Sequence, residues 1–598
     1  MVRSGSAVRQ AVRQDKVRAG SRCVGNREEP SVANCYHALR SREALREERF
    51  MDGPAATGQR KASWPSQWLA WLLVAVACLV VAGARWRLRG VPIERDEGEY
   101  AYFGQLLLAG FPPFRLAYSL KLPGTQAAYA VIMAVFGETP AGIRIGLLFV
   151  NAATTVLVFL LGRRVLNTVG AVAAAMAFAF LSLESAFLGS FAHATHFVVS
   201  AAVAGLLLLL RAQDSGRLRL VLASGVLLGV AMVMKQTGIV YLAFAATWLA
   251  FDRRAMDGRR LLAGEGTLLL GAALPLTLIV AWVVAGGTVR QFWFWVIQNG
   301  RDYATSPSVH YAAELFADTA SRALEEAWVL WALVAAGFVA AAWPGSPRRE
   351  RAFLLGLSVA SFAGVSIGFY YRPHYFVLAL PAAGLLVGAL VRFAVERAKP
   401  ERRRLAAIAA LALVVAGGAQ VVWEQRRIFL DLGPTQISRT LSGMNPFPEA
   451  LEIARYIAAR TGPEDRIAVL GSEPEIPFYA RRRSATGHVY MYGLMGPEAA
   501  ARAMQEEMAR EIEATRPAYI VWVLMPVSWL MKADSDPWLL RWAQAYVTTD
   551  YELVGLAEIL DVERTAYYWD DLANQAPGPA DNRIAVFRRR DFKPRAGP

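Results

Sequence analysis

Three carboxylates stand within four positions of the stretch VPIERDEGEYAYFG, which begins at residue 91: Asp96, Glu97 and Glu99. The stretch follows the first long apolar segment of the chain, and ionisable groups near hydrocarbon are costly and usually functional. An ionised aspartate can accept a proton from a hydroxyl group as that hydroxyl attacks an electrophilic carbon. Asp96 is therefore a candidate general base, and Glu97 is a candidate catalytic partner that holds Asp96 or a metal ion.

The same residues have a structural interpretation. Asp96, followed three residues later by Glu99, resembles a capping box at the start of a helix. Tyr100 and Phe103 then begin the apolar face of a helix lying along the membrane surface. The spacing alone favours this structural interpretation, although the two are compatible because a rigid helix start can aim a carboxylate into a cavity.

Two histidines three residues apart occur in the stretch FAHATHFVV. On a helix His193 and His196 would share one face. Together with an acidic residue from another loop, such as Glu99, they could bind a divalent metal such as Zn²⁺. The pattern favours the alternative, in which both histidines bond to backbone or phosphate groups at an interfacial helix start. These three residues are thus candidates for a metal or an acceptor.

Candidate phosphate ligands follow two later apolar segments. Lys235 stands in MVMKQTG, and Arg372 and His374 stand in FYYRPHYFVLALP. A lysine ammonium can hold a phosphate, and arginine is a bidentate phosphate ligand. The alternatives are a snorkelling lysine and an interfacial anchor of arginine with aromatic residues.

The composition is that of a membrane protein with soluble parts. The chain has 598 residues, of which 55% are hydrophobic and 19% charged, with a net charge of +15 and a mean hydropathy of +0.30. It is too apolar for an ordinary soluble enzyme and too long for one compact domain. Its three cysteines, Cys23, Cys35 and Cys78, exclude a disulfide scaffold and a cysteine metal site.

Eleven apolar stretches approach the ~20 residues that cross a bilayer. They are 67–85, 140–162, 168–188, 194–210, 219–234, 238–251, 262–285, 325–343, 352–370, 375–391 and 405–422. Arginines gather in alternate loops between them, which predicts that these loops are cytoplasmic. The N-terminus is then inside, and both the loop 86–139 and the C-terminal part are outside.

These features predict three parts: a disordered basic cytoplasmic tail at 1–66, a multi-span membrane domain at 67–422, and an extracytoplasmic α/β domain at 423–598. Met51 is an alternative start of the chain. In the last part, PEALEIARYIAART and GPEAAARAMQEEMAREIEATR have helical patterns, whereas RIAVLG, AYIVWVL, YELVGLAEI and RIAVFRR have strand patterns. This part lacks a glycine-rich phosphate loop and a catalytic elbow, so we expect it to cover or shape a site built elsewhere.

With this topology, the ionisable residues gather on the outer side, at span ends or in outer loops. They are Asp96, Glu97, Glu99, Lys121, Glu184, His193, His196, Lys235, Arg301, Arg372 and His374. A transporter is expected to carry such charges near mid-membrane on broken helices. The pattern instead predicts a polar rim where a lipid head group would arrive.

Several of these segments together resemble the C-superfamily (GT-C) of polytopic glycosyltransferases, of the bacterial family 39 and 83 type. That group is related to protein O-mannosyltransferases and to the lipid A aminoarabinose transferase. The resemblance spans about residues 67–420 and rests on RDEGEYAYFGQLLLAG, KLPGTQAAYAVIMAVFG, RIGLLFVNAATTVLVFLLGRRV, KQTGIVYL and YYRPHYFVLALPAAGLLVG. It implies a polytopic helical GT-C fold with a small outer α/β domain.

The resemblance also implies an activity. Such an enzyme takes a sugar from a polyprenyl-phosphate donor on the periplasmic side of the bacterial inner membrane and attaches it to an envelope lipid, glycan or protein. Asp96 matches the acidic catalytic residue of the family, and Lys235 and Arg372, joined here by His374, lie near positions that hold the lipid phosphate. His196 stands where many relatives have a carboxylate, so no metal is required by the resemblance, although a divalent metal is compatible with it.

Two other classes stay open at this point. One is a lipid-linked sugar transporter or flippase, and the other is a membrane-anchored envelope assembly protein. The expected partners are the donor, its acceptor and membrane lipids, with no nucleic acid.

Overall fold

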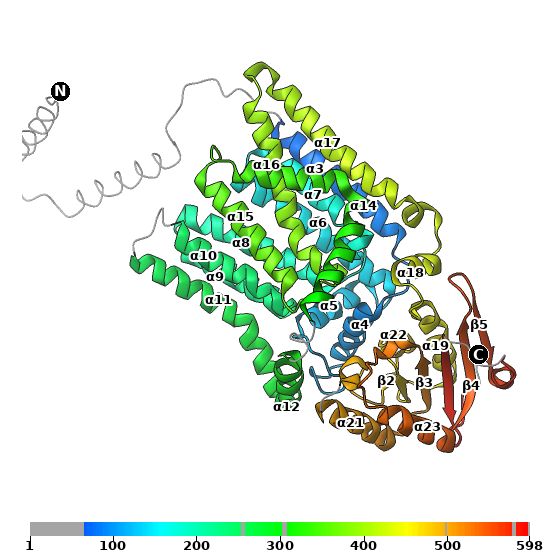
Figure 1. Cartoon of the computed structure of the whole chain (residues 1–598). Helices are drawn as coiled ribbons and strands as arrows, with labels where there is room; N and C mark the ends of the chain where they lie inside the picture. The colour runs from blue at the N-terminus through cyan, green and yellow to red at the C-terminus, as the bar shows by residue number, and fades with distance from the viewer. Residues whose placement is uncertain (1–64, 253–257, 302–307, 497–498, 577–581, 596–598) are drawn as a thin grey trace, which may run out of the picture. The chain divides into compact units, whose positions relative to one another are not determined.

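The computed structural model describes residues 65–252, 258–301, 308–496, 499–576 and 582–595. The chain from Trp64 onward forms one compact unit (Figure 1). The expected tail at 1–66 lies outside the described residues, except for its last two residues. Met51, Cys23 and Cys35 also lie outside them.

Seven helical segments of the described chain are long and apolar enough to cross a membrane. They are α3 (Gln67–Arg87), α6 (Pro140–Val165), α8 (Ala194–Ser215), α11 (Gly258–Ala285), α14 (Val309–Ala342), Pro373–Arg397, which ends in α16 (Leu380–Arg397), and Pro400–Glu424, which ends in α17 (Arg403–Glu424). Further helices are α5 (Gly124–Phe136), α7 (Thr168–Leu181), α9 (Leu218–Met234), α10 (Ile239–Phe251), α12 (Val289–Phe292) and α15 (Arg348–Ser366). A polytopic helical protein is confirmed.

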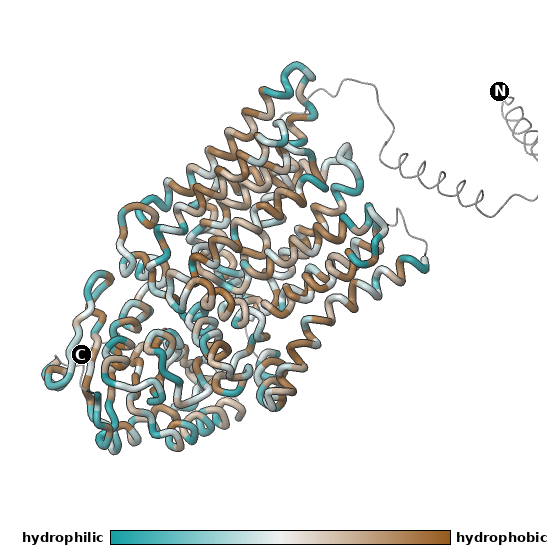
Figure 2. The backbone as a smooth tube through the Cα atoms, turned by 180° about the vertical axis from the view of Figure 1, so that it is seen from behind, coloured by the Kyte–Doolittle hydropathy of each residue, from teal (hydrophilic) through white to brown (hydrophobic). Residues whose placement is uncertain are grey.

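Each of the eleven expected spans falls on one of these helices, but their number as membrane crossings stays a prediction. The helix α7 illustrates the difference, because its 14 residues are fewer than the ~20 that cross a bilayer. Every residue from Val169 to Leu181 is buried, so α7 is surrounded by other helices. Figure 2 shows apolar residues along the bundle helices and hydrophilic residues at their ends.

A six-stranded mixed sheet lies in the C-terminal part, with strand order β2-β1-β3-β6-β4-β5. The strands are β1 (Arg466–Leu470), β2 (Arg483–Ser484), β3 (Tyr519–Leu524), β4 (Tyr551–Ile559), β5 (Thr565–Trp569) and β6 (Arg583–Arg589). β1 is parallel to β2 and β3, whereas β6 is antiparallel to β3 and β4. The four strands expected from the sequence are present, and β2 and β5 are additional.

Helices cover both faces of this sheet. They include α19 (Phe447–Arg460), α20 (Glu475–Ala480), α21 (Ala499–Thr515), α22 (Pro526–Trp529) and α23 (Trp538–Asp550), whereas α18 (Pro434–Ser442) precedes them and packs in the core of the helix bundle. Alternate residues of β3 point to opposite sides: Ile520 packs in a core with α21 and α23, and Val521 packs in a core with α19. We call residues 445–595 the C-terminal α/β segment; the predicted boundary at residue 423 stays a prediction.

The short helices α4 (Arg95–Leu108) and α20 join the helix bundle to this segment. The helix α4 follows α3 and lies between the bundle and the C-terminal α/β segment (Figure 1). Tyr102 accepts a hydrogen bond from the backbone of Ser484 at 2.7 Å. A Cβ atom at Gly98 would lie only 2.9 Å from the backbone nitrogen of Glu475, so glycine permits the close approach of α4 and α20.

Candidate active site

The first turn of α4 carries the acidic residues, but its cap differs from the predicted one. Glu94 is the N-cap, and its carboxylate accepts a hydrogen bond from the Glu97 backbone at 2.8 Å. The Glu97 carboxylate in turn accepts one from the Glu94 backbone at 3.4 Å. The predicted capping box of Asp96 and Glu99 is therefore wrong by two residues, because glutamate is not among the preferred N-cap types. Asp96 is thus not used as a cap.

Glu97 is an anchor of the fold. Its side chain is fully buried and forms an ion pair of 2.7 Å with Arg144 of α6. It also accepts a hydrogen bond of 2.7 Å from the backbone nitrogen of Ala192. These bonds occupy its oxygens, which favours a positioning role for Glu97, and its predicted catalytic role stays a prediction.

Lys121 holds the other two carboxylates. Its ammonium lies 2.9 Å from Asp96 Oδ1 and 2.6 Å from Glu99 Oε2. Ser119 donates a further hydrogen bond to Glu99. Glu99 therefore neutralises Lys121 and does not join the predicted metal set. Burial alone would raise the pKa of Asp96, but the Lys121 ammonium holds it well below its usual range. Asp96 is therefore ionised throughout the physiological pH range.

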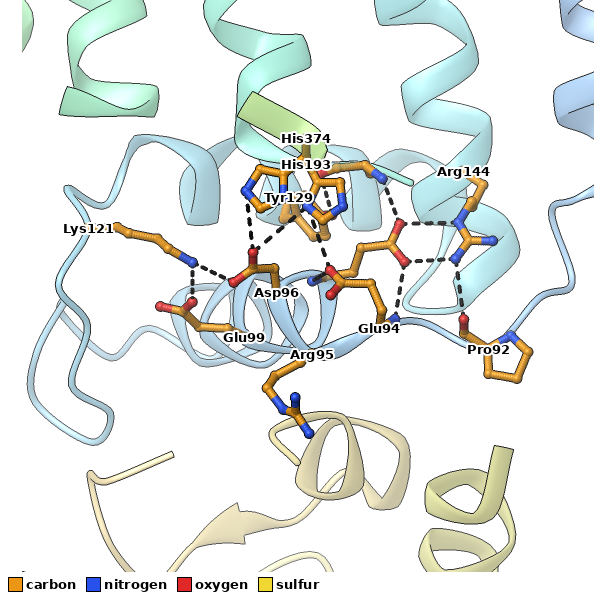
Figure 3. A network of polar contacts seen from close by, with 12 residues as sticks. Pro92, Glu94, Arg95, Asp96, Glu99, Lys121, Tyr129, Arg144, His193 and His374 are labelled. Atoms are coloured by element: carbon orange, nitrogen blue, oxygen red, sulfur yellow. Dashed lines mark hydrogen bonds and ion pairs between the residues drawn. The ribbon is translucent and has the colours of Figure 1, made fainter. Parts of the chain in front are cut away.

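Two histidines face the second oxygen of Asp96 (Figure 3). His193 Nδ1 lies 3.9 Å and His374 Nε2 lies 3.7 Å from Asp96 Oδ2. The two imidazole rings are stacked, with centroids 4.1 Å apart. His374, predicted on the phosphate, thus lies beside the carboxylate.

His193 and His196 both lie at the start of α8. His193 is the N-cap of α8 and has an extended backbone, with ψ of 151°. His196 is buried within electrostatic range of Arg85 of α3 and of His193, and it forms a hydrogen bond with the backbone of Gly189. A metal role of His196 stays a prediction.

A different set of three residues can hold a metal ion. Asp96, His193 and His374 each offer a ligand atom, and these atoms lie within 4.8 Å of one another. Both ring nitrogens of His193 are buried and lack hydrogen-bond partners among the described residues. Burial lowers the pKa of His193 to about 4, so its imidazole is neutral and able to bind a metal. One carboxylate and two imidazoles fit Zn²⁺, which would supply positive charge at the site.

Lys235 and Arg372 are half-buried, each beside an aromatic ring. The Lys235 ammonium lies 3.4 Å from the centroid of the Tyr375 ring, and the Arg372 guanidinium lies 5.6 Å from that of Tyr370. Lys235 forms no ion pair with a described residue. Burial, and then repulsion from Lys121, lower the pKa of Lys235 to about 7. It is thus a cation that a phosphate could pair with.

The C-terminal α/β segment also reaches this site. The Tyr490 hydroxyl donates a hydrogen bond of 3.1 Å to Asp96 Oδ1. Arg95, next to Asp96, forms an ion pair of 2.9 Å with Glu473. No local sequence pattern marks Tyr490, and Lys121 was expected only as a member of the polar rim.

Both the sequence and the fold resemble those of known proteins. Residues 121–284 match the family described as dolichyl-phosphate-mannose-protein mannosyltransferase. The structure is similar to that of ArnT from Cupriavidus metallidurans bound to undecaprenyl phosphate, with a TM-score of 0.56, 18% identity and coverage of 88% of this chain and 98% of that one. The chain has the GT-C glycosyltransferase fold. The predicted resemblance to the GT-C superfamily is confirmed.

A second GT-C structure is related more distantly. It is the archaeal oligosaccharyltransferase AglB from Archaeoglobus fulgidus in complex with an inhibitory peptide and a dolichol-phosphate. The TM-score is 0.50 at 13% identity, with coverage of 86% of this chain and 75% of that one. A search of curated proteins finds no match to this sequence.

The metal set can be tested without an activity assay. We expect purified protein, incubated with Zn²⁺ and then dialysed, to retain one equivalent of metal by mass spectrometry. His193→Asn should lose this metal because a ligand is removed, whereas His196→Asn should retain it. Equal retention by the two variants, or no metal on the wild type, would contradict the assignment.

Proposed function

We propose that the chain is a membrane glycosyltransferase, which transfers a sugar from a polyprenyl-phosphate donor to an acceptor of the cell envelope. The observation that carries this proposal is an ionised carboxylate, Asp96, that Lys121 holds within electrostatic range of the second cation Lys235. A base and a phosphate-binding cation in one site are what sugar transfer from a phosphate requires. The GT-C fold supports the same class of reaction.

In the proposed reaction Asp96 acts as the general base. The acceptor hydroxyl attacks the anomeric carbon, and its proton passes to Asp96 as the new bond between oxygen and carbon forms. The bond from the anomeric carbon to the phosphate oxygen breaks, and the lipid phosphate leaves with the electron pair. Because the pKa of Asp96 is low, the proton moves late, together with bond formation. We infer a direct displacement with inversion from the family resemblance.

The leaving phosphate gains negative charge as its bond to the sugar breaks. Lys235 and Arg372 are the proposed ligands of this phosphate, and cations already fixed in a partly buried site stabilise such charge without reorganisation. The long apolar helices would bind the carrier chain. ArnT and AglB, with their bound undecaprenyl phosphate and dolichol-phosphate, support a donor of this class.

We also propose where the reaction occurs. The arginines in alternate loops support a topology in which the N-terminus is cytoplasmic, and we infer that the Asp96 end of the bundle lies on the periplasmic side of a bacterial inner membrane. The acceptor would be an envelope lipid, glycan or protein that reaches the site from that side.

The role of Asp96 predicts a large loss of activity on its removal. We expect Asp96→Asn to lower kcat for transfer of radiolabelled sugar from polyprenyl-phosphate donors by about 10²–10⁴-fold, because an amide cannot accept the proton. Asp318→Asn is the matched control, since Asp318 is exposed and pairs with Arg322 on its own helix. Wild-type activity in Asp96→Asn would refute the proposed base.

The low pKa of Lys235 predicts how donor binding depends on pH. Lys235 is cationic below pH 7 and increasingly neutral above it, whereas a phosphodiester donor stays anionic. The KM for the donor should therefore rise as pH increases from 7, by about tenfold per unit once the amine is mostly neutral. Lys235→Arg should flatten this rise, because a guanidinium keeps its charge. A donor KM that is equal at pH 6.5 and 8.5 in the wild type would exclude Lys235 as the phosphate ligand.

A further inference from the structure

The two oxygens of Asp96 have different surroundings. Oδ1 accepts hydrogen bonds from the Lys121 ammonium at 2.9 Å and from the Tyr490 hydroxyl at 3.1 Å. Oδ2 faces the rings of His193 and His374 at 3.7 to 3.9 Å, which is beyond hydrogen-bond distance. One oxygen is therefore bonded on two sides, and the other is open to a further group.

We propose that Tyr490 is a positioning residue for sugar transfer. Its hydroxyl and Lys121 fix Oδ1 of Asp96, so that, when no metal ion is bound to Asp96, His193 and His374, Oδ2 is the oxygen that takes the proton from the acceptor. The inference rests on the proposed function and adds to it a residue of the C-terminal α/β segment, 394 positions away from Asp96 in the sequence. The segment then completes the active site in addition to covering it.

The carboxylate needs such a restraint. The terminal torsion of an aspartate has a broad, roughly two-fold preference, so a carboxylate bonded by Lys121 alone could turn and exchange its oxygens. A second donor on the same oxygen defines the plane of the group. The Tyr490 hydroxyl also lies 3.1 Å from the backbone oxygen of Arg95, but its single hydrogen bonds more strongly to the charged oxygen of Asp96.

A network of bonds holds Tyr490 at this distance. Arg95 donates a hydrogen bond of 2.5 Å to the backbone oxygen of Ser472, and the Ser472 hydroxyl accepts one of 2.8 Å from the backbone nitrogen of Met491. Ser472 thus links the residue before Asp96 to the residue after Tyr490. The Arg95 guanidinium also donates to Asn445 at 3.1 Å. The base and its restraint are therefore positioned by the same contacts.

The Tyr490→Phe variant tests the proposal, because it removes the hydroxyl and leaves the ring in place. We expect kcat to fall by roughly tenfold, as for the loss of one hydrogen bond to a charged group, with the KM of donor and acceptor nearly unchanged.

Two other tyrosines provide matched controls. Tyr479 accepts a hydrogen bond of 2.9 Å from the Ile93 backbone, so Tyr479→Phe weakens the same interface without touching Asp96. The Tyr492 hydroxyl donates to the Val527 backbone at 3.3 Å, within the C-terminal α/β segment. Both controls should keep the wild-type kcat and KM, and the unfolding temperature of all three variants is measured in the same detergent.

The outcomes distinguish a failure of the positioning role of Tyr490 from a failure of the proposed function. A wild-type kcat in Tyr490→Phe, with Asp96→Asn inactive, would overturn the positioning role alone. Equal losses of kcat and unfolding temperature in Tyr490→Phe and Tyr479→Phe would also overturn it, since the hydroxyl would then only stabilise the interface. Equal sugar transfer by the wild type and Asp96→Asn would overturn the proposed function itself, and this inference with it.

Discussion

The ion pair between Glu97 and Arg144 is the contact on which the rest of the site depends. The side chains are 0% and 3% exposed, so each charge needs the other, and breaking a buried pair of this kind is strongly destabilising. Glu97 also completes the capping box of α4 with Glu94 and accepts a hydrogen bond from the backbone of Ala192, next to His193. One carboxylate therefore holds the start of α4, which carries Asp96, against α6 and against the backbone beside His193.

The three acidic residues of α4 have three different roles because their partners differ. Glu97 is committed to Arg144, and Glu99 is committed to Lys121 and Ser119. Asp96 shares Lys121 and keeps one oxygen open. The shared ammonium keeps Asp96 ionised. The proposed base therefore stays negatively charged although cations lie close to it. Specific partners thus stabilise each of these carboxylates beside the membrane, and only Asp96 keeps an oxygen available for the proposed chemistry.

Much of the fold could be predicted from the sequence, because its signals are local. Long apolar runs gave the positions of the helices, and short apolar patterns located four of the six strands. Asp96 could be selected as a candidate base from the acidic residues around it in the stretch that follows α3. The cap was misplaced because Glu94 and Glu97 form a box with an unusual first residue. The count of membrane crossings was not settled, since helices such as α7 are apolar but short.

The composition of the site could not be predicted, because tertiary contacts determine it. His193 and His374 lie far apart in the chain and meet only when α8 and the segment before α16 pack together. Tyr490 follows a short loop after β2, and nothing in its neighbourhood indicates a contact with α4. Spacing alone suggested His196 as the metal partner of His193, whereas the structure groups His193 with Asp96 and His374.

The most direct measurement is the structure of Asp96→Asn with an intact polyprenyl-phosphate sugar, determined by electron cryo-microscopy. The account predicts that the lipid phosphate lies within hydrogen-bond distance of the Lys235 ammonium. It also predicts that the anomeric carbon faces the residue 96 side chain, with room for an acceptor hydroxyl between them. A phosphate bound away from Lys235, or a sugar whose anomeric carbon faces away from residue 96, would contradict it.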